Sequence, residues 1–413
     1  MFGPPKRPDS KDLKVNLAAP PAWTFAPGDS IIGTVVRHTS IVSPEATIQL
    51  TLRGATETRT LERSGNQSED RVSRWDLLDP KTIDLFRGPL HLPEGSEECL
   101  TFPFEVNIPP GPSVTQIRRR KNESSYLPVD QESVEQHILP GTFFESNNGD
   151  SSGMVKYTLE VEMRYRRGGG YFTNKDTCPV VIRHTALDPP LVHYEMIKHT
   201  TNTRIHNHRL VTGTGQLSFR QKMQNIYGSS KVPEFTYRVE VSAPKAVQLD
   251  HPVPIPLAVN IVCVPDKTSP ALQDAVVKVT LQSIRVTIAA MTSVYVRGDS
   301  GPKSLSDFWR KHHTLDIKTT LPNSQNPVAF QVGQESRPFD VGSICRLYLG
   351  SDSFRKSPQR QHFHGISVRA VHPSFKSYIV WHRHELECNL CLVVAGQSQT
   401  VTVCGPITVM PAD

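Results

Sequence analysis

The stretch "GMVKYTLEVEMRYRR", residues 153–167, alternates apolar and polar side chains over most of its length. Its apolar members recur at every second position: Val155, Tyr157, Leu159, Val161, Met163 and Tyr165. A helix would scatter these side chains around its axis, whereas a strand places successive residues on opposite faces. The pattern therefore predicts a long strand with one buried face and one solvated face, and the solvated face ends in arginines.

The same period-two pattern recurs along the chain, in "ATIQLTL", "LTFPFEVNI", "FTYRVEV" and "LECNLCLVV", which begin at residues 46, 100, 235 and 386. Less regular strands are predicted at 30–37, 178–184, 254–264, 275–297 and 400–409. Amphipathic helical patterns are rare, and the two best candidates are 76–86 and 304–313. Half-buried strands separated by turn residues favour an all-β protein built from antiparallel β-sandwiches.

The length of 413 residues predicts more than one domain. Hydrophobic residues make up 37% and charged residues 21%, which is typical of a folded globular chain. We expect an N-terminal sandwich at 11–184, linker and connecting strands at 185–231, and a C-terminal sandwich at 232–413. Within the first sandwich, the polar segments 55–74 and 111–139 are predicted to be inserted loops without regular structure.

The composition also bears on location and partners. The first residues lack the apolar core of a secretory signal, and no apolar run approaches the roughly 20 residues of a membrane-spanning helix. The seven cysteines have no framework spacing and are interpreted as reduced thiols in a cytoplasmic protein. The net charge of +6 weakly favours acidic partners and falls short of a dedicated nucleic-acid binder.

The order of these segments resembles that of the arrestin family. "LKVNLAAPPAWTFAPGDSIIGTVVRHTS", residues 13–40, looks like the opening of an arrestin N-terminal domain. "FPFEVNIPPGP" and "LPGTFFESNNGDSSGMVKYTLEVEM" are similar to later segments of that domain, with Thr142 where serine is usual. The second half is more divergent and resembles the C-terminal domain of fungal α-arrestins. The resemblance implies two immunoglobulin-like β-sandwiches, the arrestin fold, with few short helices.

The resemblance also implies a function. Arrestin-like proteins are non-catalytic adaptors that bind cytosolic tails of transporters or receptors in endocytosis, trafficking or signalling, at the plasma membrane or endosomes. Many α-arrestins recruit HECT-type ubiquitin ligases through PPxY or LPxY motifs, and this sequence contains neither. The ubiquitin-ligase adaptor role is therefore implied by the resemblance alone.

Two groups of cations are candidate binding residues. Arg164, Arg166 and Arg167, with Lys14 on the first strand, could meet phosphates or acidic tails. The alternative is an ordinary solvated face on which Glu160 and Glu162 serve as cross-strand partners. A second group, Arg118, Arg119, Arg120 and Lys121, is a candidate contact for anionic lipid headgroups, or simply part of a solvated loop.

Histidine clusters offer the best case for an enzyme, as the alternative to an adaptor. They lie at 206–208, 362–364 and 382–384, and His382, His384 and Glu387 could belong to a metal set. "CNLC" at 388–391 is a lone pair whose cysteines would lie on opposite faces of a strand. No nucleophile, phosphate-binding or dinucleotide motif is present. We therefore predict no catalytic residue, no metal and no cofactor.

Overall fold

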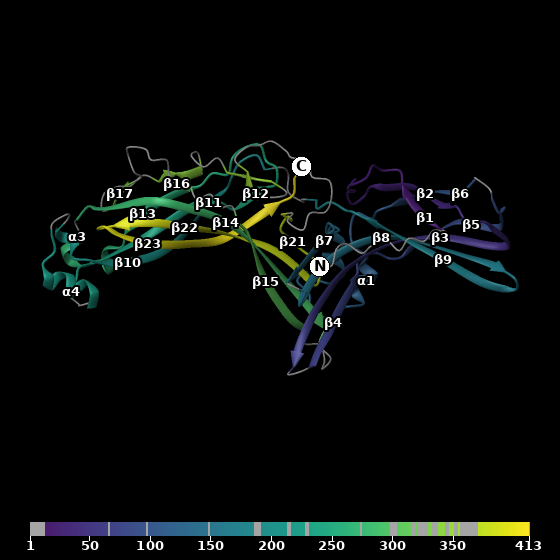
Figure 1. The fold of residues 1–413 in the computed structure, drawn as a ribbon, viewed down its shortest axis with the longest axis horizontal. Helices are drawn as coiled ribbons and strands as arrows, with labels where there is room; N and C mark the ends of the chain where they lie inside the picture. Colours follow the sequence, from purple (N-terminus) through teal and green to yellow (C-terminus); the bar gives the residue numbers. More distant parts are fainter. Residues whose placement is uncertain are drawn as a thin grey trace. The chain divides into compact units, whose positions relative to one another are not determined.

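The computed structural model divides into two compact units (Figure 1). Unit 1 comprises residues 1–187, 292–309 and 375–382, and unit 2 comprises residues 188–291, 310–374 and 383–413. Neither unit is therefore continuous in sequence, whereas the sequence analysis placed continuous domains at 11–184 and 232–413. The residues that the structure describes are 13–412 without 65–66, 96–97, 148, 186–190, 213–215, 228–230, 273–274, 298–303, 315–318, 321–328, 333–337, 343–346, 351–353 and 356–370.

Unit 1 is a sandwich of two antiparallel sheets. The smaller sheet has the order β1-β2-β6, and the larger has the order β4-β3-β8-β7, with β5 paired to β3 and β9 paired to β8. The strands are β1 Lys14–Leu17, β2 Ser30–Arg37, β3 Ile41–Ser64, β4 Gln67–Asp76, β5 Lys81–Leu92, β6 Leu100–Asn107, β7 Phe143–Asn147, β8 Ser151–Arg167 and β9 Gly170–Val180.

The inner faces of these sheets share one hydrophobic core. It contains Ile31 and Phe104 from the smaller sheet and Leu50, Leu159 and Val161 from the larger one. Along β8 every second residue from Val155 to Met163 is buried, as the alternation predicts. The all-β fold with antiparallel sheets and few short helices is therefore confirmed.

Unit 2 has its own core and two main sheets, β10-β11-β13-β18 and β12-β23-β22-β14-β15. The long strands β14, β15 and β22 contribute residues to both units. β21 Phe375–Lys376 pairs with β22 but lies in unit 1. The other strands from β10 onward are β10 Met196–His206, β11 Glu234–Pro244, β12 Ala246–Gln248, β13 Ala258–Cys263, β14 Val277–Arg297, β15 Ser304–Thr314, β16 Thr319–Thr320, β17 Ala329–Val332, β18 Phe339–Asp340, β19 Tyr348–Leu349, β20 Phe354–Arg355, β22 Val380–Val394 and β23 Gln397–Met410.

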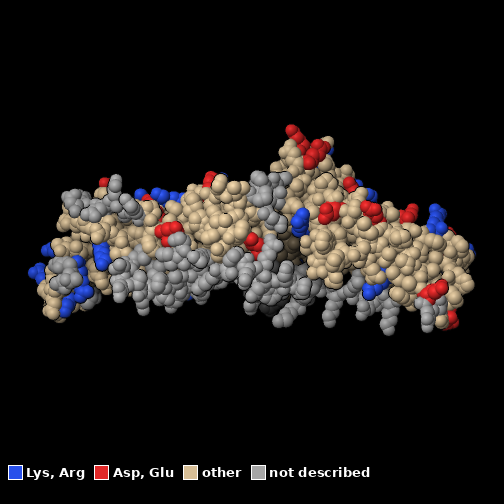
Figure 2. Space-filling view, turned by 90° about the horizontal axis from the view of Figure 1, so that it is seen from above, with Lys and Arg blue, Asp and Glu red and all other residues tan. Residues whose placement is uncertain are grey.

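The helices described are short: α1 Val114–Arg118, α2 Gln131–Gln136, α3 Arg209–Thr212 and α4 Phe219–Tyr227. In Figure 2, Lys and Arg gather at the end of unit 2 that carries α3 and α4, which include Arg209, Arg220 and Lys222. No helix in the described ranges is long and apolar enough to span a bilayer.

Several local predictions are wrong. Segment 55–74 is no loop, because β3 and β4 pair along it, and exposed cross-strand pairs such as Arg59–Asp70 and Arg74–Glu57 account for its polar composition. Segment 76–86 comprises the last residue of β4, a four-residue connection and the start of β5, and 304–313 lies in β15, so neither is a helix. Segment 111–139 contains α1 and α2, where a structureless loop was expected.

Candidate functional site

The β8–β9 hairpin presents the arginines of the opening stretch. Arg167 pairs with Gly170, and the two residues between them, Gly168 and Gly169, have φ values of 57° and 87°. Two consecutive positive φ values are those of a tight hairpin turn that glycine adopts without steric cost. Residues 167–170 therefore form the turn of a hairpin, and Arg164, Arg166 and Arg167 are exposed beside it.

The acidic residues on the solvated face of β8 have partners elsewhere. Glu160 Oε2 lies 2.6 Å from Arg53 Nε on β3, and Glu162 Oε2 lies 2.7 Å from Lys175 Nζ on β9. All four side chains are well exposed, so these ion pairs add little to stability. They do, however, neutralise the middle of the face. Glu160 and Glu162 are therefore cross-strand partners, as the alternative of an ordinary solvated face expects, but their partners are Arg53 and Lys175 and not the arginines at the end of β8.

A fourth arginine joins the end of this face. Thr47 on β3 pairs with Arg87 on one side and with Arg164 on the other, so the three residues form one row across β5, β3 and β8. Strands are spaced about 4.8 Å apart, which puts the Cα atoms of Arg87 and Arg164 about 10 Å apart. We call Arg87, Arg164, Arg166 and Arg167 the β8 arginine cluster.

The positive charge of the cluster is not neutralised by ion pairs among the described residues. Within the described part of the chain, no carboxylate forms an ion pair with any of its four members. All four side chains are exposed. Sequence reasoning missed Arg87 because it follows the segment predicted as a helix, and only the pairing of β5 with β3 brings it to Arg164. The row that Arg87, Thr47 and Arg164 form contains two cations and no acidic residue, and Arg166 lies two positions from Arg164 on the same strand face.

Aromatic stacking orients one of the arginines. The guanidinium carbon of Arg164 lies 4.8 Å from the centre of the Tyr171 ring, and the Tyr171 hydroxyl donates to Glu45 Oε2 at 3.1 Å. Stacking covers one flat face of the guanidinium but leaves the donors on its edge available. A forked pair of hydrogen bonds to a carboxylate or phosphate needs these edge donors. Arg164 is thus partly preorganised for an anion.

Lys14 does not belong to this cluster. It is exposed on β1, where it pairs with Val36 of β2 in the smaller sheet. The neighbouring Val15 N–H donates to the buried Asp176 carboxylate at 2.9 Å, which ties β1 to β9. Asp176 faces Val161, three positions along β8 from Arg164. The structure therefore does not bring Lys14 into the row of arginines with which the sequence analysis grouped it.

The second cationic group lies on α1 and the turn after it. Arg118, Arg119 and Lys121 line an open hollow between α1 and α2, whereas Arg120 forms an ion pair with Glu123 at 2.8 Å. This run is therefore split between two environments.

The histidine clusters do not assemble a metal site among the described residues. His382 and His384 are buried on β22, His206 is exposed at the end of β10, and 362–364 lie outside the described residues. Cys388 is buried and Cys391 lies on the opposite face of β22, where its thiol contacts Ser398, as predicted from the spacing. Burial raises the pKa of the Cys388 thiol to about 12, which disfavours the reactive thiolate.

One buried polar cluster in unit 1 has the residue types of a catalytic triad. Thr292 Oγ1 lies 2.8 Å from His382 Nδ1 and is hydrogen-bonded to the Glu145 carboxylate, which is 3.6 Å from the same Nδ1. In a triad the nucleophile and the acid contact different ring nitrogens. Here both contact Nδ1, and all three side chains are at most 5% exposed. The arrangement is that of a structural hydrogen-bond network.

The comparisons with known proteins assign no family. No protein-family model and no curated protein matches the chain. Among solved structures, the sporulation control protein Spo0M from Bacillus subtilis is similar, with 11% identity and a TM-score of 0.23, over 60% of this chain and 78% of that chain.

Proposed function

We propose that this protein is a non-catalytic adaptor that binds acidic or phosphorylated cytosolic segments of membrane proteins at the β8 arginine cluster. The observation that carries the proposal is the distribution of charge on one sheet face. The glutamates of β8 are paired with Arg53 and Lys175, so Arg87, Arg164 and Arg166 form a cationic edge in which no arginine is ion-paired with a carboxylate of the described residues.

The chemistry of the edge suits a multiply charged chain. Arg164 and Arg166 are two positions apart on one strand face, so their Cα atoms are about 7 Å apart. Phosphoserine and phosphothreonine carry between one and two negative charges and accept forked hydrogen bonds from arginine. A segment with two acidic or phosphorylated residues at alternate positions would match this spacing if it lies extended along the edge.

The test is a binding measurement on the purified full chain. Fluorescence anisotropy would compare a doubly phosphorylated peptide with its unphosphorylated form, for wild type, Arg164→Glu/Arg166→Glu, and Lys278→Glu. The control lysine is exposed on β14 in unit 2, so it undergoes the same kind of charge change outside the cluster. A charge-assisted hydrogen bond is worth about 1.5–3 kcal/mol, so the double variant should weaken binding about 100-fold or more.

The result that would overturn this function is equally clear. If the double variant binds as well as Lys278→Glu, or if phosphorylation does not raise affinity, the cluster is a solvated face. A role in trafficking would next be tested in cells by crosslinked recovery of transporters or receptors. Recovery of a HECT-type ligase with them would support the ligase connection, for which the chain offers no PPxY or LPxY motif.

A further inference from the structure

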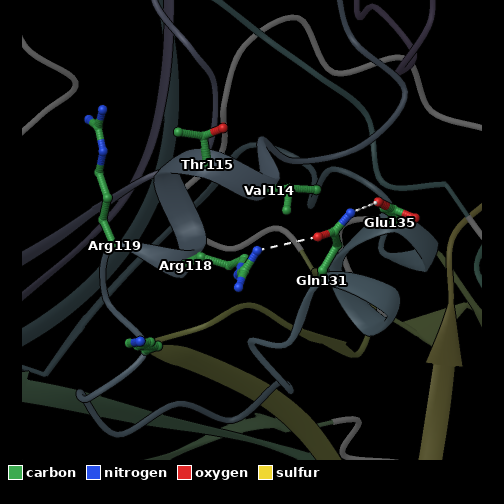
Figure 3. Close-up of a pocket in the computed structure, with 7 residues that line it drawn as sticks. Val114, Thr115, Arg118, Arg119, Gln131 and Glu135 are labelled. Carbon is green, nitrogen blue, oxygen red and sulfur yellow. Dashed lines mark hydrogen bonds between the residues drawn. The ribbon is translucent and has the colours of Figure 1, made fainter.

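A hollow of about 560 Å³ opens between α1 and α2 in unit 1 (Figure 3). Its volume lies within the range of small-molecule sites, about 300–1,000 Å³. The residues that line it are Val114, Thr115, Arg118, Arg119, Lys121, Gln131 and Glu135. Three of the seven are cations and one is an anion, so the lining carries a formal charge of +2. Such a site favours a small anion with more than one charge.

The walls of the hollow are anchored to the rest of unit 1. Ser113 caps α1 by accepting from Gln116 N at 3.2 Å, and its hydroxyl donates to Asp79 Oδ2 at 2.6 Å. Ile117 on α1 and Val134 on α2 are buried in the core of the unit. The two helices are therefore held in place by side chains that point away from the hollow.

Hydrogen bonds position the polar side chains inside it. The Gln131 amide oxygen accepts from Arg118 Nη1 at 3.3 Å, and its nitrogen donates to Glu135 Oε1 at 2.9 Å, as Figure 3 shows. Gln131 thus donates a hydrogen bond to one carboxylate oxygen of Glu135, the one acidic residue among the seven described residues that line the hollow. Arg119 Nη1 donates to Gln116 Oε1 at 3.1 Å. Each guanidinium has five N–H donors, so most remain available for a ligand.

Within the basic run 118–121, Arg120 differs from the other three cations in its surroundings. Arg120 sits between two lining residues in sequence, yet it does not line the hollow, and its Nη1 is 2.8 Å from Glu123 Oε1. Within the described residues, Arg118, Arg119 and Lys121 form no ion pair with a carboxylate. The fold therefore neutralises one cation of the run and directs the other three to one hollow.

We propose that this hollow binds the phosphate monoester groups of a small polyanion of the inositol polyphosphate class, either free or as a lipid headgroup. Two arginines supply planar donor pairs that match phosphate oxygens, and Lys121 supplies a point charge. Each phosphate monoester carries between one and two negative charges. Two such groups on one ring would more than balance the +2 of the lining. This site is separate from the β8 arginine cluster, and its proposal does not depend on the adaptor function.

The experiment uses the purified full chain and inositol 1,4,5-trisphosphate as the soluble probe, with calorimetry at two salt concentrations. Arg118→Gln/Arg119→Gln should weaken binding at least tenfold, and Arg120→Gln should leave it within twofold of wild type. Circular dichroism would check that all variants are folded. If the trisphosphate does not bind at millimolar concentration, or if Arg120→Gln weakens binding as much as the double variant, the proposal is overturned.

A second arm distinguishes the source of the phosphate. Vesicles of phosphatidylcholine with phosphatidylinositol 4,5-bisphosphate would be compared with vesicles of equal charge that contain phosphatidylserine. Stronger sedimentation with the bisphosphate lipid, lost in Arg118→Gln/Arg119→Gln, supports a headgroup ligand. Equal sedimentation with both vesicles, together with retained trisphosphate binding, supports a soluble ligand.

Discussion

The buried cluster of Glu145, Thr292 and His382 provides a sharp test of how unit 1 is held together. The perturbation is Thr292→Val, which keeps the shape of the side chain and removes only the hydroxyl. That hydroxyl contacts both His382 Nδ1 and the Glu145 carboxylate. It has one proton to donate. With an ionised Glu145, the consistent arrangement is a chain in which His382 Nδ1–H donates to Thr292 and Thr292 donates to Glu145.

The magnitude follows from the two bonds that valine cannot make. A hydrogen bond to a charged group contributes about 1.5–3 kcal/mol and a neutral one about 1 kcal/mol. His382 Nδ1 and Glu145 Oε2 remain 3.6 Å apart and can compensate for part of the loss. We therefore expect Thr292→Val to lower the free energy of unfolding of unit 1 by about 2–3 kcal/mol.

Tryptophan fluorescence during urea unfolding measures this loss in the right unit. All four tryptophans, Trp23, Trp75, Trp309 and Trp381, belong to unit 1. With a urea dependence of about 2–3 kcal/mol/M, the midpoint should move down by about 1 M.

Two matched variants decide whether the hydroxyl is responsible. Thr292→Ser keeps the hydroxyl and removes one methyl group, so it should cost only about 1 kcal/mol. In a Glu145→Leu background, the cost of Thr292→Val should largely disappear, because the carboxylate that needed the hydroxyl is gone. If Thr292→Val is as stable as Thr292→Ser, or more stable, the network does not stabilise the unit and the reasoning is wrong.

Two further outcomes are expected in unit 1. A Cβ at Gly33 would lie 2.4 Å from the Asn16 carbonyl oxygen and 2.6 Å from Phe104, so Gly33→Ala should lower the free energy of unfolding in urea by at least about 2 kcal/mol. A Cβ at Gly170 would have no neighbour closer than 3.8 Å, so Gly170→Ala should be nearly neutral. Equal losses in the two variants would contradict the packing argument. Burial lowers the pKa of His137 from 6.5 despite the opposing charge of Asp130. Below pH 6.5 the unfolded chain therefore binds more protons, and stability should fall as the pH drops from 7 towards the lower folded pKa. This decline should be shallower in His137→Phe, and an unchanged pH profile would exclude His137 as its source.

The sequence by itself determined which faces of the strands are buried. In β8 and β22 every second residue is buried along most of the strand, because side-chain direction alternates along any extended backbone. The two-residue Gly168-Gly169 turn was predictable for the same local reason. The prediction failed at 55–74, where a polar segment was interpreted as a loop although β3 and β4 pair along it. A hairpin whose faces are solvated needs no alternating apolar residues, so its sequence does not show the strand pattern.

The groupings of residues depend on the tertiary structure. Arg87 reaches Arg164 only through the register of β5 and β8 on either side of β3, and no local pattern specifies that register. Glu145, Thr292 and His382 are far apart in sequence and meet because segments 292–309 and 375–382 belong to unit 1. Arg120 differs from its neighbours only in the contacts that the fold provides. Side-chain alternation is a property of the local chain, whereas these sites are made by contacts between distant segments, which form only when the core closes.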